Sequence, residues 1–433
     1  MRIVQAQLSA PPTIASLRAR ELPRSGIRKV YNAARELQAQ GVDVIRLDIG
    51  DPDFELPARI TEATHAALLA GQTHYSPMIG LPEAREAIAR HMARKLVARA
   101  ALPAKDGGQG RPPYEEWLEH IVVNQGATQG LNAALQLTCG IGQSVLLPEI
   151  YWPNYIQQCV LGGIEPRFYR LTDHFQPVLE DLACLSDEGT RAVLVNSPSN
   201  PTGALFPPET IRAIYDFAVA RGMWIVSDEA YCDFVYQGEH VSPLQLDWQL
   251  PEDERRVLAV YSFSKSYAAT GLRLGWTVSP RADVTLQLAT MNEPLTGSLT
   301  TPLQFGLAAG LDGDDSAERC AALRPRWQHA GELLRESGLP FDPPAGGLFY
   351  FIDISATGLP AEEFAAQLLA EQHVAVVPGD SFGLQPTQQA DGTLTFAAGE
   401  RARRCVRLCF AVPEARMAEG VRRIAGFIKT KTA

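Results

Sequence analysis

The stretch Ser262-Phe-Ser-Lys-Ser-Tyr-Ala-Ala-Thr-Gly-Leu-Arg-Leu-Gly-Trp276 decides how this chain is interpreted. It follows an apolar, partly β-branched run at residues 256–261, which predicts a buried strand. Lys265 therefore lies just beyond a strand end, among small and hydroxylated residues. This setting suits a lysine that forms a Schiff base with an aldehyde cofactor, because such an amine must be held near its target and partly desolvated. A loop with an ordinary surface lysine is the simpler alternative.

Two groups of residues could bind a phosphate near this lysine. Ser262 and Arg273 would supply a hydroxyl and a planar guanidinium fork. A second group follows a predicted strand at residues 120–124, where small residues precede an apolar helical run. This order of elements directs free backbone N–H groups and a helix dipole at an anion. The candidate ligands there are Gly126, Ala127 and Thr128, although small residues at such a turn often serve only the turn.

The alternation of strands and helices over residues 120–280 predicts right-handed βαβ units and a mostly parallel sheet. Ligands of such sheets bind beyond the carboxyl ends of the strands. We therefore expect the polar and aromatic residues that follow these strands to meet at one edge. Trp152 could stack on a flat cofactor ring there, or equally fill the core. Five candidate groups each follow a different strand: Gly126 with Ala127 and Thr128, then Trp152, Asn200, Asp228, and Ser262 with Lys265.

Both ends of the chain predict further elements. A helix at 27–40 and a strand at 44–48 lead to a turn-rich loop, in which Gly50 would allow another group to approach the backbone closely. Tyr75 lies in a second loop, a setting in which packing is the commoner role. Beyond residue 310 the chain predicts a smaller α+β domain, with strands at 346–353, 374–379 and 405–410 and a final helix at 414–429.

Arg407 lies in the middle of the apolar strand at 405–410. A buried arginine is rare without a partner. Either an internal carboxylate or the carboxylate of a ligand must therefore meet it, and both alternatives stay open at this stage.

Three stretches interrupt the predicted elements. Residues 98–119 lose their periodicity and predict a surface insertion, and residues 383–404 also predict irregular structure. Residues 292–302 predict a loop, after which a long helix is expected through Arg335.

Composition limits the classes of function. The chain has 433 residues, of which 46% are hydrophobic, so it can form a large core, and we expect two domains. A net charge of −10 without a basic block argues against a nucleic-acid partner. We expect no membrane span and no secretory signal, and hence a cytoplasmic location. Seven scattered cysteines without zinc-like spacing predict no metal site.

Taken together, the motifs resemble the class I/II aminotransferases, which are pyridoxal-phosphate-dependent enzymes of fold type I similar to aspartate aminotransferase. The matching pieces follow the family order from about residue 27 to the carboxyl end. They are Gly50-Asp-Pro-Asp-Phe54, Tyr75 with Gly80-Leu-Pro82, Gly126-Ala-Thr128, Trp152-Pro-Asn-Tyr155, Asn200-Pro-Thr-Gly203, Asp228-Glu-Ala-Tyr231, Ser262-Phe-Ser-Lys265 with Gly271-Leu-Arg273, and Arg407.

The resemblance implies an α/β fold. A large domain with a mostly parallel seven-stranded sheet flanked by helices is expected, beside a smaller α+β domain formed by the amino-terminal segment and the carboxyl-terminal part. We expect residues 1–50 to form an arm and part of the small domain, residues 51–310 the large cofactor-binding domain, and residues 311–433 the small carboxyl-terminal domain. The stretches near 98–119 and 383–404 depart from the family pattern and leave the substrate open.

The resemblance also implies a role for each candidate residue. Lys265 would hold pyridoxal 5′-phosphate as an internal aldimine and carry a proton, and Asp228 would keep the ring nitrogen protonated. Tyr231 and Asn200 would bind the phenolic oxygen, while Trp152 would stack on the ring. The phosphate would be bound by Gly126, Ala127, Thr128, Ser262, Arg273 and, from a neighbouring subunit, Tyr75. Arg407, Gly50, Trp152 and Asn200 would contact the substrate.

Transfer of the amino group of an L-amino acid to a 2-oxo acid is thus the first hypothesis, and a homodimer with shared active sites is the implied assembly. An elimination, replacement or cyclisation enzyme with the same cofactor is the alternative, because these reactions share the first proton abstraction. A regulator with a fused DNA-binding domain is disfavoured by the short amino-terminal arm. The expected side-chain pocket, with residues 27–31, Trp152, Tyr155 and a partner's residues 292–301, favours neutral, aromatic or polar substrates.

Overall fold

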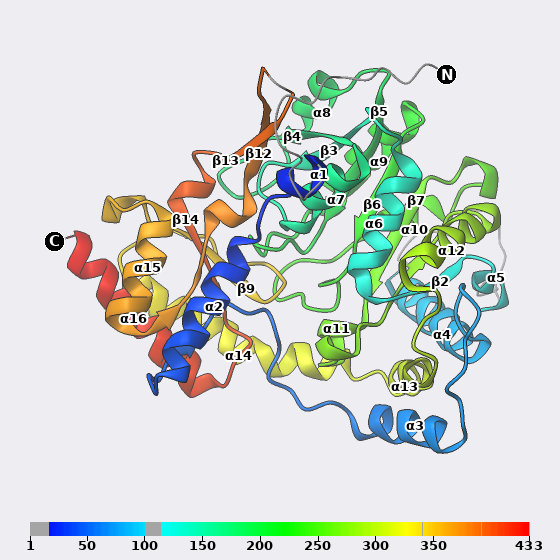
Figure 1. Ribbon diagram of the computed structural model, residues 1–433, viewed down its shortest axis with the longest axis horizontal. Helices are drawn as coiled ribbons and strands as arrows, with labels where there is room; N and C mark the ends of the chain where they lie inside the picture. Colours follow the sequence, from blue (N-terminus) through cyan, green and yellow to red (C-terminus); the bar gives the residue numbers. More distant parts are fainter. Residues whose placement is uncertain (1–16, 100–113, 340, 391, 433) are drawn as a thin grey trace, which may run out of the picture.

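The computed structural model describes residues 17–99, 114–339, 341–390 and 392–432. A seven-stranded sheet dominates the right-hand part of Figure 1, and smaller sheets lie beside it on the left. None of the helices in these ranges is long and apolar enough to cross a membrane.

The large sheet confirms the predicted α/β fold. Six of its strands are parallel to one another, and β8 runs antiparallel to both of its neighbours. In spatial order the strands are β2 (Ile121–Asn124), β8 (Gly275–Val278), β7 (Val257–Ser262), β6 (Trp224–Asp228), β5 (Thr190–Asn196), β3 (Ser144–Pro148) and β4 (Glu165–Tyr169). The edge strand β4 was not predicted, because its proline and charged residues break the apolar run that marks the inner strands.

Helices cover both faces of the sheet because successive strand residues point to opposite sides. Val122, Leu194 and Val260 belong to the core on one face, and their chain neighbours Val123 and Val193 belong to the core on the other. The first core includes α6 (Gly126–Thr138), α7 (Asn154–Gly162) and α12 (Ala282–Thr296). The second includes α4 (Pro82–Arg99), α9 (Pro208–Ala220), α10 (Pro243–Asp247) and α13 (Thr301–Asp312).

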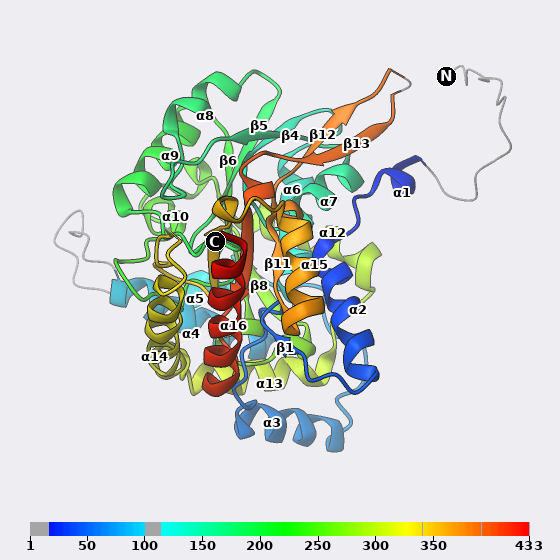
Figure 2. The ribbon, with the colours of Figure 1, turned by 90° about the vertical axis from the view of Figure 1, so that its left-hand side faces the viewer.

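The amino-terminal segment packs with the carboxyl-terminal part of the chain, as Figure 2 shows. Its strand β1 pairs in parallel with β10, and a second small sheet has the order β11-β14-β9. The expected domain limits at residues 50 and 310 stay a prediction. The elements of this region are α1 (Leu17–Glu21), α2 (Gly26–Ala39), β1 (Ile45–Arg46), α14 (Ser316–Arg335), β9 (Phe349–Asp353), α15 (Ala361–Gln372), β10 (Val374–Ala375), β11 (Val377–Pro378), β14 (Cys405–Cys409) and α16 (Glu414–Thr432).

The prediction of irregular structure at 383–404 was wrong. This stretch forms an antiparallel hairpin of β12 (Leu384–Gln388) and β13 (Leu394–Ala398), which projects at the top of Figure 2. Its residues alternate between half-buried and exposed and include a proline, so the hairpin lacks a continuous apolar run. Of the expected insertion at 98–119, residues 100–113 lie outside the described residues, and Glu115–Leu118 form the short helix α5.

The predicted loop at 292–302 was too long. Helix α12 continues to Thr296, although Pro294 lies inside it. Its residue Asn292 is fully buried and donates a hydrogen bond to Asn124 Oδ1 at 3.1 Å, so tertiary packing outweighs the local turn signal. The long helix expected through Arg335 is two helices, α13 and α14, with Gly313 directly after the first.

Candidate active site

A cavity of about 270 Å³ lies at the carboxyl edge of the large sheet. It collects residues from the ends of five strands and from the small sheets, as the strand order predicts. Most of the candidate residues line it: Gly50, Ala127, Thr128, Trp152, Asn200, Asp228, Tyr231, Ser262, Lys265, Arg273 and Arg407. Other residues of the wall are Ile27, Asp48, Ile49, Leu131, Ala230, Ser264 and Phe349.

Lys265 lies in α11 (Phe263–Ser266), the short helix that follows β7. Its Nζ donates a hydrogen bond to the carbonyl oxygen of Gly50 at 2.5 Å. A Cβ at Gly50 would lie 2.5 Å from Cζ of Phe349, so only glycine fits between the lysine and this ring. Burial lowers the pKa of the Lys265 amine to about 8. A neutral, nucleophilic amine is therefore accessible near physiological pH.

This lowered pKa predicts how fast Lys265 reacts with an aldehyde at different pH values. The reactive form is the neutral amine, whose fraction rises as the pH increases through about 8. We expect the rate at which cofactor-free protein captures pyridoxal phosphate to rise over that range and then level off. Stopped-flow absorbance would measure it, and a rate that keeps rising to about pH 10, where an ordinary lysine titrates, would contradict the prediction.

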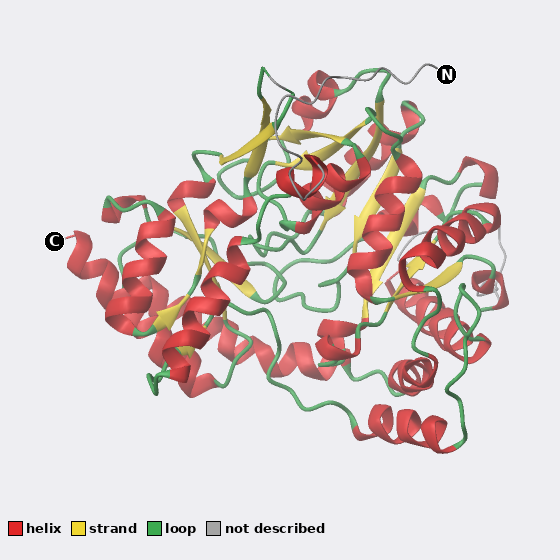
Figure 3. Ribbon diagram, in the orientation of Figure 1, coloured by secondary structure: helices red, strands yellow, loops and turns green. Residues whose placement is uncertain are grey.

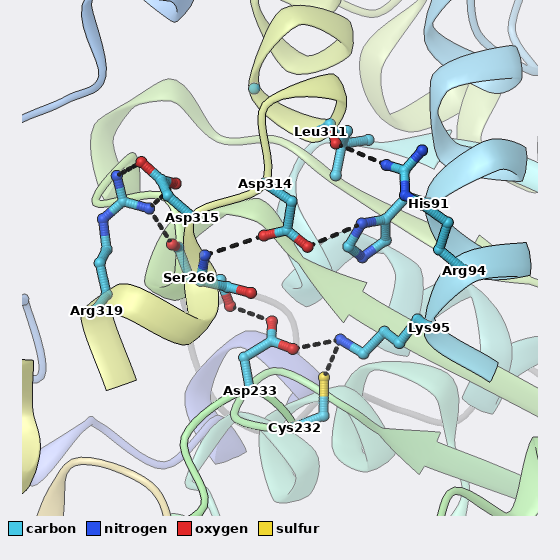
Figure 4. Close-up of polar contacts among 12 residues, drawn as sticks. His91, Arg94, Lys95, Cys232, Asp233, Ser266, Leu311, Asp314, Asp315 and Arg319 are labelled. Atoms are coloured by element: carbon cyan, nitrogen blue, oxygen red, sulfur yellow. Dashed lines mark hydrogen bonds and ion pairs between the residues drawn. The ribbon is translucent and has the colours of Figure 1, made fainter. Parts of the chain in front are cut away.

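Polar contacts surround Ser266, the residue directly after Lys265 in the chain (Figure 4). The carboxylate of Asp233 accepts hydrogen bonds from Nζ of Lys95 at 2.6 Å and from Oγ of Ser266 at 2.6 Å. Burial opposes the ionisation of Asp233, but the ammonium of Lys95 outweighs it and holds the pKa of this carboxyl well below its usual range. Arg319 donates a hydrogen bond to the Ser266 carbonyl at 2.8 Å. The residue after Lys265 is thus fixed at both its side chain and its backbone.

The wall of the cavity contains a cradle for an anion. Arg273 has a left-handed backbone, with φ of 55°, and its guanidinium donates a hydrogen bond to the Thr270 carbonyl at 2.9 Å. A Cβ at Gly126 would lie 2.6 Å from Nη2 of Arg273, so this glycine lets the guanidinium approach the amino end of α6. Ser262 and Ser264 add hydroxyl groups to the same wall. A cation, two hydroxyls and a helix N-terminus suit a phosphate.

Asp228 lies at the carboxyl end of β6 and is buried. Tyr155 donates a hydrogen bond to its Oδ2 at 2.5 Å, and the backbone N–H of Ala230 donates to Oδ1 at 3.0 Å. Burial raises the pKa of Asp228 to about 6, while both hydrogen bonds act in the opposite direction. The carboxylate is therefore ionised at neutral pH and able to stabilise a cation in the cavity.

Aromatic and amide side chains complete the wall around Asp228. Trp152 is half-buried and meets Tyr155 edge to face, with ring centroids 5.5 Å apart. Tyr231 meets the Phe349 ring in the same manner at 5.7 Å, and burial raises its pKa. The backbone N–H of Asn200 donates a hydrogen bond to Asn196 Oδ1 at 2.9 Å, which fixes the loop after β5. These contacts hold flat and polar groups around a space that a planar ring could occupy.

Arg407 lies in β14, with 2% of its surface exposed. Its Nη1 donates to Oδ1 of Asn200 at 2.8 Å, and its Nη2 donates to the carbonyl oxygen of Asp48 at 2.7 Å. Its Nε is buried without a hydrogen-bond partner among the described residues. These partners are neutral groups, and burial lowers the pKa of the guanidinium. The contacts favour the second alternative for Arg407, a ligand carboxylate.

Replacement of Arg407 by alanine is expected to weaken substrate binding by about 2–5 kcal/mol, the usual loss for a buried charged partner. The cofactor should remain bound, because the phosphate cradle and Lys265 are untouched. Titration of the holoenzyme with an unreactive carboxylate analogue would measure the change. Arg407→Lys, which keeps the charge but not the fork, should recover part of the affinity, and unchanged affinity in Arg407→Ala would contradict the assignment.

Two candidate residues do not line the cavity. Gly126 lies behind Arg273, as described above, whereas Tyr75 lies elsewhere on the surface with 94% of its area exposed. Tyr75 lines a separate, open cavity together with residues 298–302. Within the described part of one chain, Tyr75 is thus not brought to Lys265.

Sequence reasoning missed some functional contacts. Tyr155 was expected only in a side-chain pocket, whereas its hydroxyl contacts Asp228. Ser264 and Phe349 were not singled out. The position of Ser264 between Ser262 and Lys265 was the one available signal, because a short helix places all three beside the same cavity.

Comparisons with known proteins agree with this geometry. A family model for aminotransferase class I and II matches residues 42–424. The chain is 36% identical over 405 residues to a probable aspartate/prephenate aminotransferase of Aquifex aeolicus, covering 90% of this chain and 92% of the relative. It is 32% identical over 394 residues to an arginine–pyruvate transaminase of Pseudomonas aeruginosa, covering 89% and 93%. The solved structure of Thermus thermophilus aspartate aminotransferase with maleate superposes with a TM-score of 0.81 at 29% identity, covering 96% of this chain and all of that one.

A mostly parallel sheet with a buried lysine at its carboxyl edge, beside an anion cradle and a buried acid, defines the class of fold-type I enzymes that use pyridoxal phosphate. The chain belongs to the class I and II aminotransferase family. The predicted family, fold and type of enzyme are thereby confirmed.

Proposed function

We propose that this aminotransferase moves the amino group of an L-amino acid to a 2-oxo acid while pyridoxal 5′-phosphate is bound to Lys265. One observation carries the proposal. A partly desolvated amine, a buried carboxylate, an anion cradle and a buried guanidinium line one cavity, each contributed by a different part of the chain. Transamination with this cofactor needs an amine to bind the aldehyde, an acid beside the ring, a site for the phosphate and a cation for the substrate carboxylate.

The residues present fit the cofactor. The absence of a Cβ at Gly126 lets the guanidinium of Arg273 lie beside the amino end of α6, and Ser262, Ala127 and Thr128 line the same cavity, so these groups could together hold the phosphate. Asp228 is the acid for the ring nitrogen. Trp152 offers a flat face, while Tyr231 and Asn200 offer hydrogen-bonding groups for the phenolic oxygen. When bound, the cofactor supplies an electron sink for the bonding electrons of the substrate α-carbon.

In the proposed reaction each side chain of the cavity has a separate role. Arg407 binds the α-carboxylate of the substrate and, with Asn200, orients the α-carbon toward Lys265. Lys265 is placed to take the α-proton of the substrate as a neutral amine and would hold that proton at Nζ as an ammonium. Asp228, as a carboxylate, would stabilise a proton on the ring nitrogen of the bound cofactor. Gly50 allows the amino-terminal segment to lie close over these groups.

A panel of amino acids tests the reaction type. Purified holoenzyme is incubated with single L-amino acids and either pyruvate or 2-oxoglutarate, and both products are quantified. We expect stoichiometric exchange of the amino group between the two. Ammonia released without an acceptor would instead indicate elimination, and a cyclic product that keeps its nitrogen would indicate cyclisation.

We also propose a homodimer with shared sites, supported by the exposure of Tyr75 on a surface that also contains residues 298–302. Sedimentation is expected to give twice the mass of the 47.2 kDa chain. Tyr75→Ala should weaken phosphate binding if Tyr75 reaches a second copy's cradle. A monomer with full activity would contradict the proposal. The expected cytoplasmic location stays a prediction.

A further inference from the structure

We propose that the substrate side-chain subsite accepts amino acids with uncharged, apolar side chains and discriminates against aspartate, glutamate and arginine. This inference rests on the proposed transamination and adds the class of substrate to it. Its basis is the charge of the cavity wall.

Among the described residues, each lysine or arginine that lines the cavity already has a role in the proposed function. Lys265 carries the proton, Arg273 belongs to the phosphate cradle and Arg407 binds the α-carboxylate. A second carboxylate on the substrate would therefore enter the cavity without a counter-charge from this wall. Burial of an unpaired charge is strongly unfavourable.

The acids of the wall are also occupied, so a cationic side chain finds no free partner among the described lining residues. Asp48 is fully buried and forms two hydrogen bonds of 2.8 Å with the guanidinium of Arg46. Asp228 accepts hydrogen bonds from Tyr155 and Ala230. The wall thus discriminates against added charge of either sign.

Two isoleucines line the part of the wall near Arg407 and Lys265, where the side chain of a bound substrate would lie. Asp48 contacts Arg407 and Gly50 contacts Lys265 through their carbonyl groups, so Ile49 lies between the two contact points. Ile27 belongs to the same wall. A Cβ at Gly26 would lie 2.1 Å from Oγ of Ser381, so the start of α2 packs directly on the turn at 379–382 and holds Ile27 in place.

The surface around Tyr75, which we propose lies at the neighbouring site of a homodimer, would not supply the missing cation. Tyr75 and the loop at 298–302 line their own cavity together with Thr73 and His74, and this lining contains no lysine or arginine among the described residues. If the homodimer brings this surface to the neighbouring site, it adds hydroxyl and aromatic groups but no strong cation.

The half-reaction of the holoenzyme tests the inference. Single amino acids are mixed with the enzyme without a 2-oxo acid, and the loss of the visible absorbance of the bound cofactor is followed by stopped flow. We expect the ratio of maximal rate to Kd for leucine, methionine or phenylalanine to exceed that for aspartate, glutamate and arginine by on the order of 10²-fold. Equal or faster reaction with a charged amino acid would overturn the inference but leave transamination intact. If no amino acid reacted, the proposed transamination would be wrong, and the inference about its substrates would fail with it.

Ile27 provides a gain-of-function test. Ile27→Arg supplies the missing cation, and we expect it to raise the aspartate-to-leucine ratio by about tenfold or more. Ile27→Gln, a long polar side chain without charge, is the matched control and should not produce this rise. The bound-cofactor spectrum checks that both variants are folded. An unchanged ratio in a folded Ile27→Arg variant would remove Ile27 from the subsite and overturn the inference at this residue.

Discussion

Lys265→Ala is expected to lower kcat by at least about 10⁴-fold, because in the proposed mechanism Lys265 is both the covalent anchor of the cofactor and the group that carries the proton. The variant should still bind pyridoxal phosphate through the cradle around Arg273, but without the visible absorbance of the lysine-bound form. Steady-state rates and absorbance spectra of the purified variant would measure both effects.

The structure offers matched controls for this experiment. Lys265→Arg keeps a positive charge but cannot form the imine, so it should be nearly as inactive as the alanine variant. Lys29→Ala removes a lysine whose side chain is 75% exposed, and it should leave rate and spectrum unchanged. A Lys265→Ala variant that retains its spectrum and more than a tenth of its activity would exclude Lys265 from its role.

Asp228→Ala is expected to lower kcat by about 10²- to 10⁴-fold while Lys265 still binds the cofactor. Asp228 is a buried acid of the cavity wall, and in the proposed mechanism it holds a proton on the ring nitrogen, so its loss would leave a much weaker electron sink. Rates of the half-reaction, together with the intact visible spectrum, would separate lost chemistry from lost binding.

Two further variants make the Asp228 experiment specific. Tyr155→Phe removes one hydrogen bond to this carboxylate and should have a smaller effect of the same kind. Asp253→Asn changes an exposed acid and should have none. If Asp228→Ala lowered activity only through loss of cofactor, Asp228 would be a binding residue and not the partner of the ring nitrogen.

The sequence was sufficient to predict much of the sheet and the candidate residues at its edge. Short apolar runs followed by polar or small residues identify strand ends, and parallel strands bring those ends together, so Asn200, Asp228 and Lys265 could be placed at one cavity in advance. The same logic failed for elements without an apolar run. The edge strand β4 and the β12–β13 hairpin mix polar residues and proline, and their strand structure depends on pairing partners distant in sequence.

Side-chain contacts between elements could not be predicted from the sequence, for a different reason. The hydrogen bond from Tyr155 to Asp228 depends on how α7 lies against β6, which no local pattern encodes. The paired contacts of Arg407 likewise required the positions of Asn200 and Asp48, which are distant from it in sequence. The sequence of one chain also offered no means to decide where Tyr75 acts.

Residues 48–50 line the cavity and connect two of its functional groups through nearby backbone carbonyls. Their carbonyl groups engage the guanidinium of Arg407 at one end and the amine of Lys265 at the other. A substrate carboxylate bound to Arg407 would compete for the first contact, and a cofactor bound to Lys265 would replace the second. The backbone at residues 48–50 would therefore lose one hydrogen-bond partner when the cofactor binds and the other when a carboxylate binds, so its conformation would depend on the occupancy of both subsites.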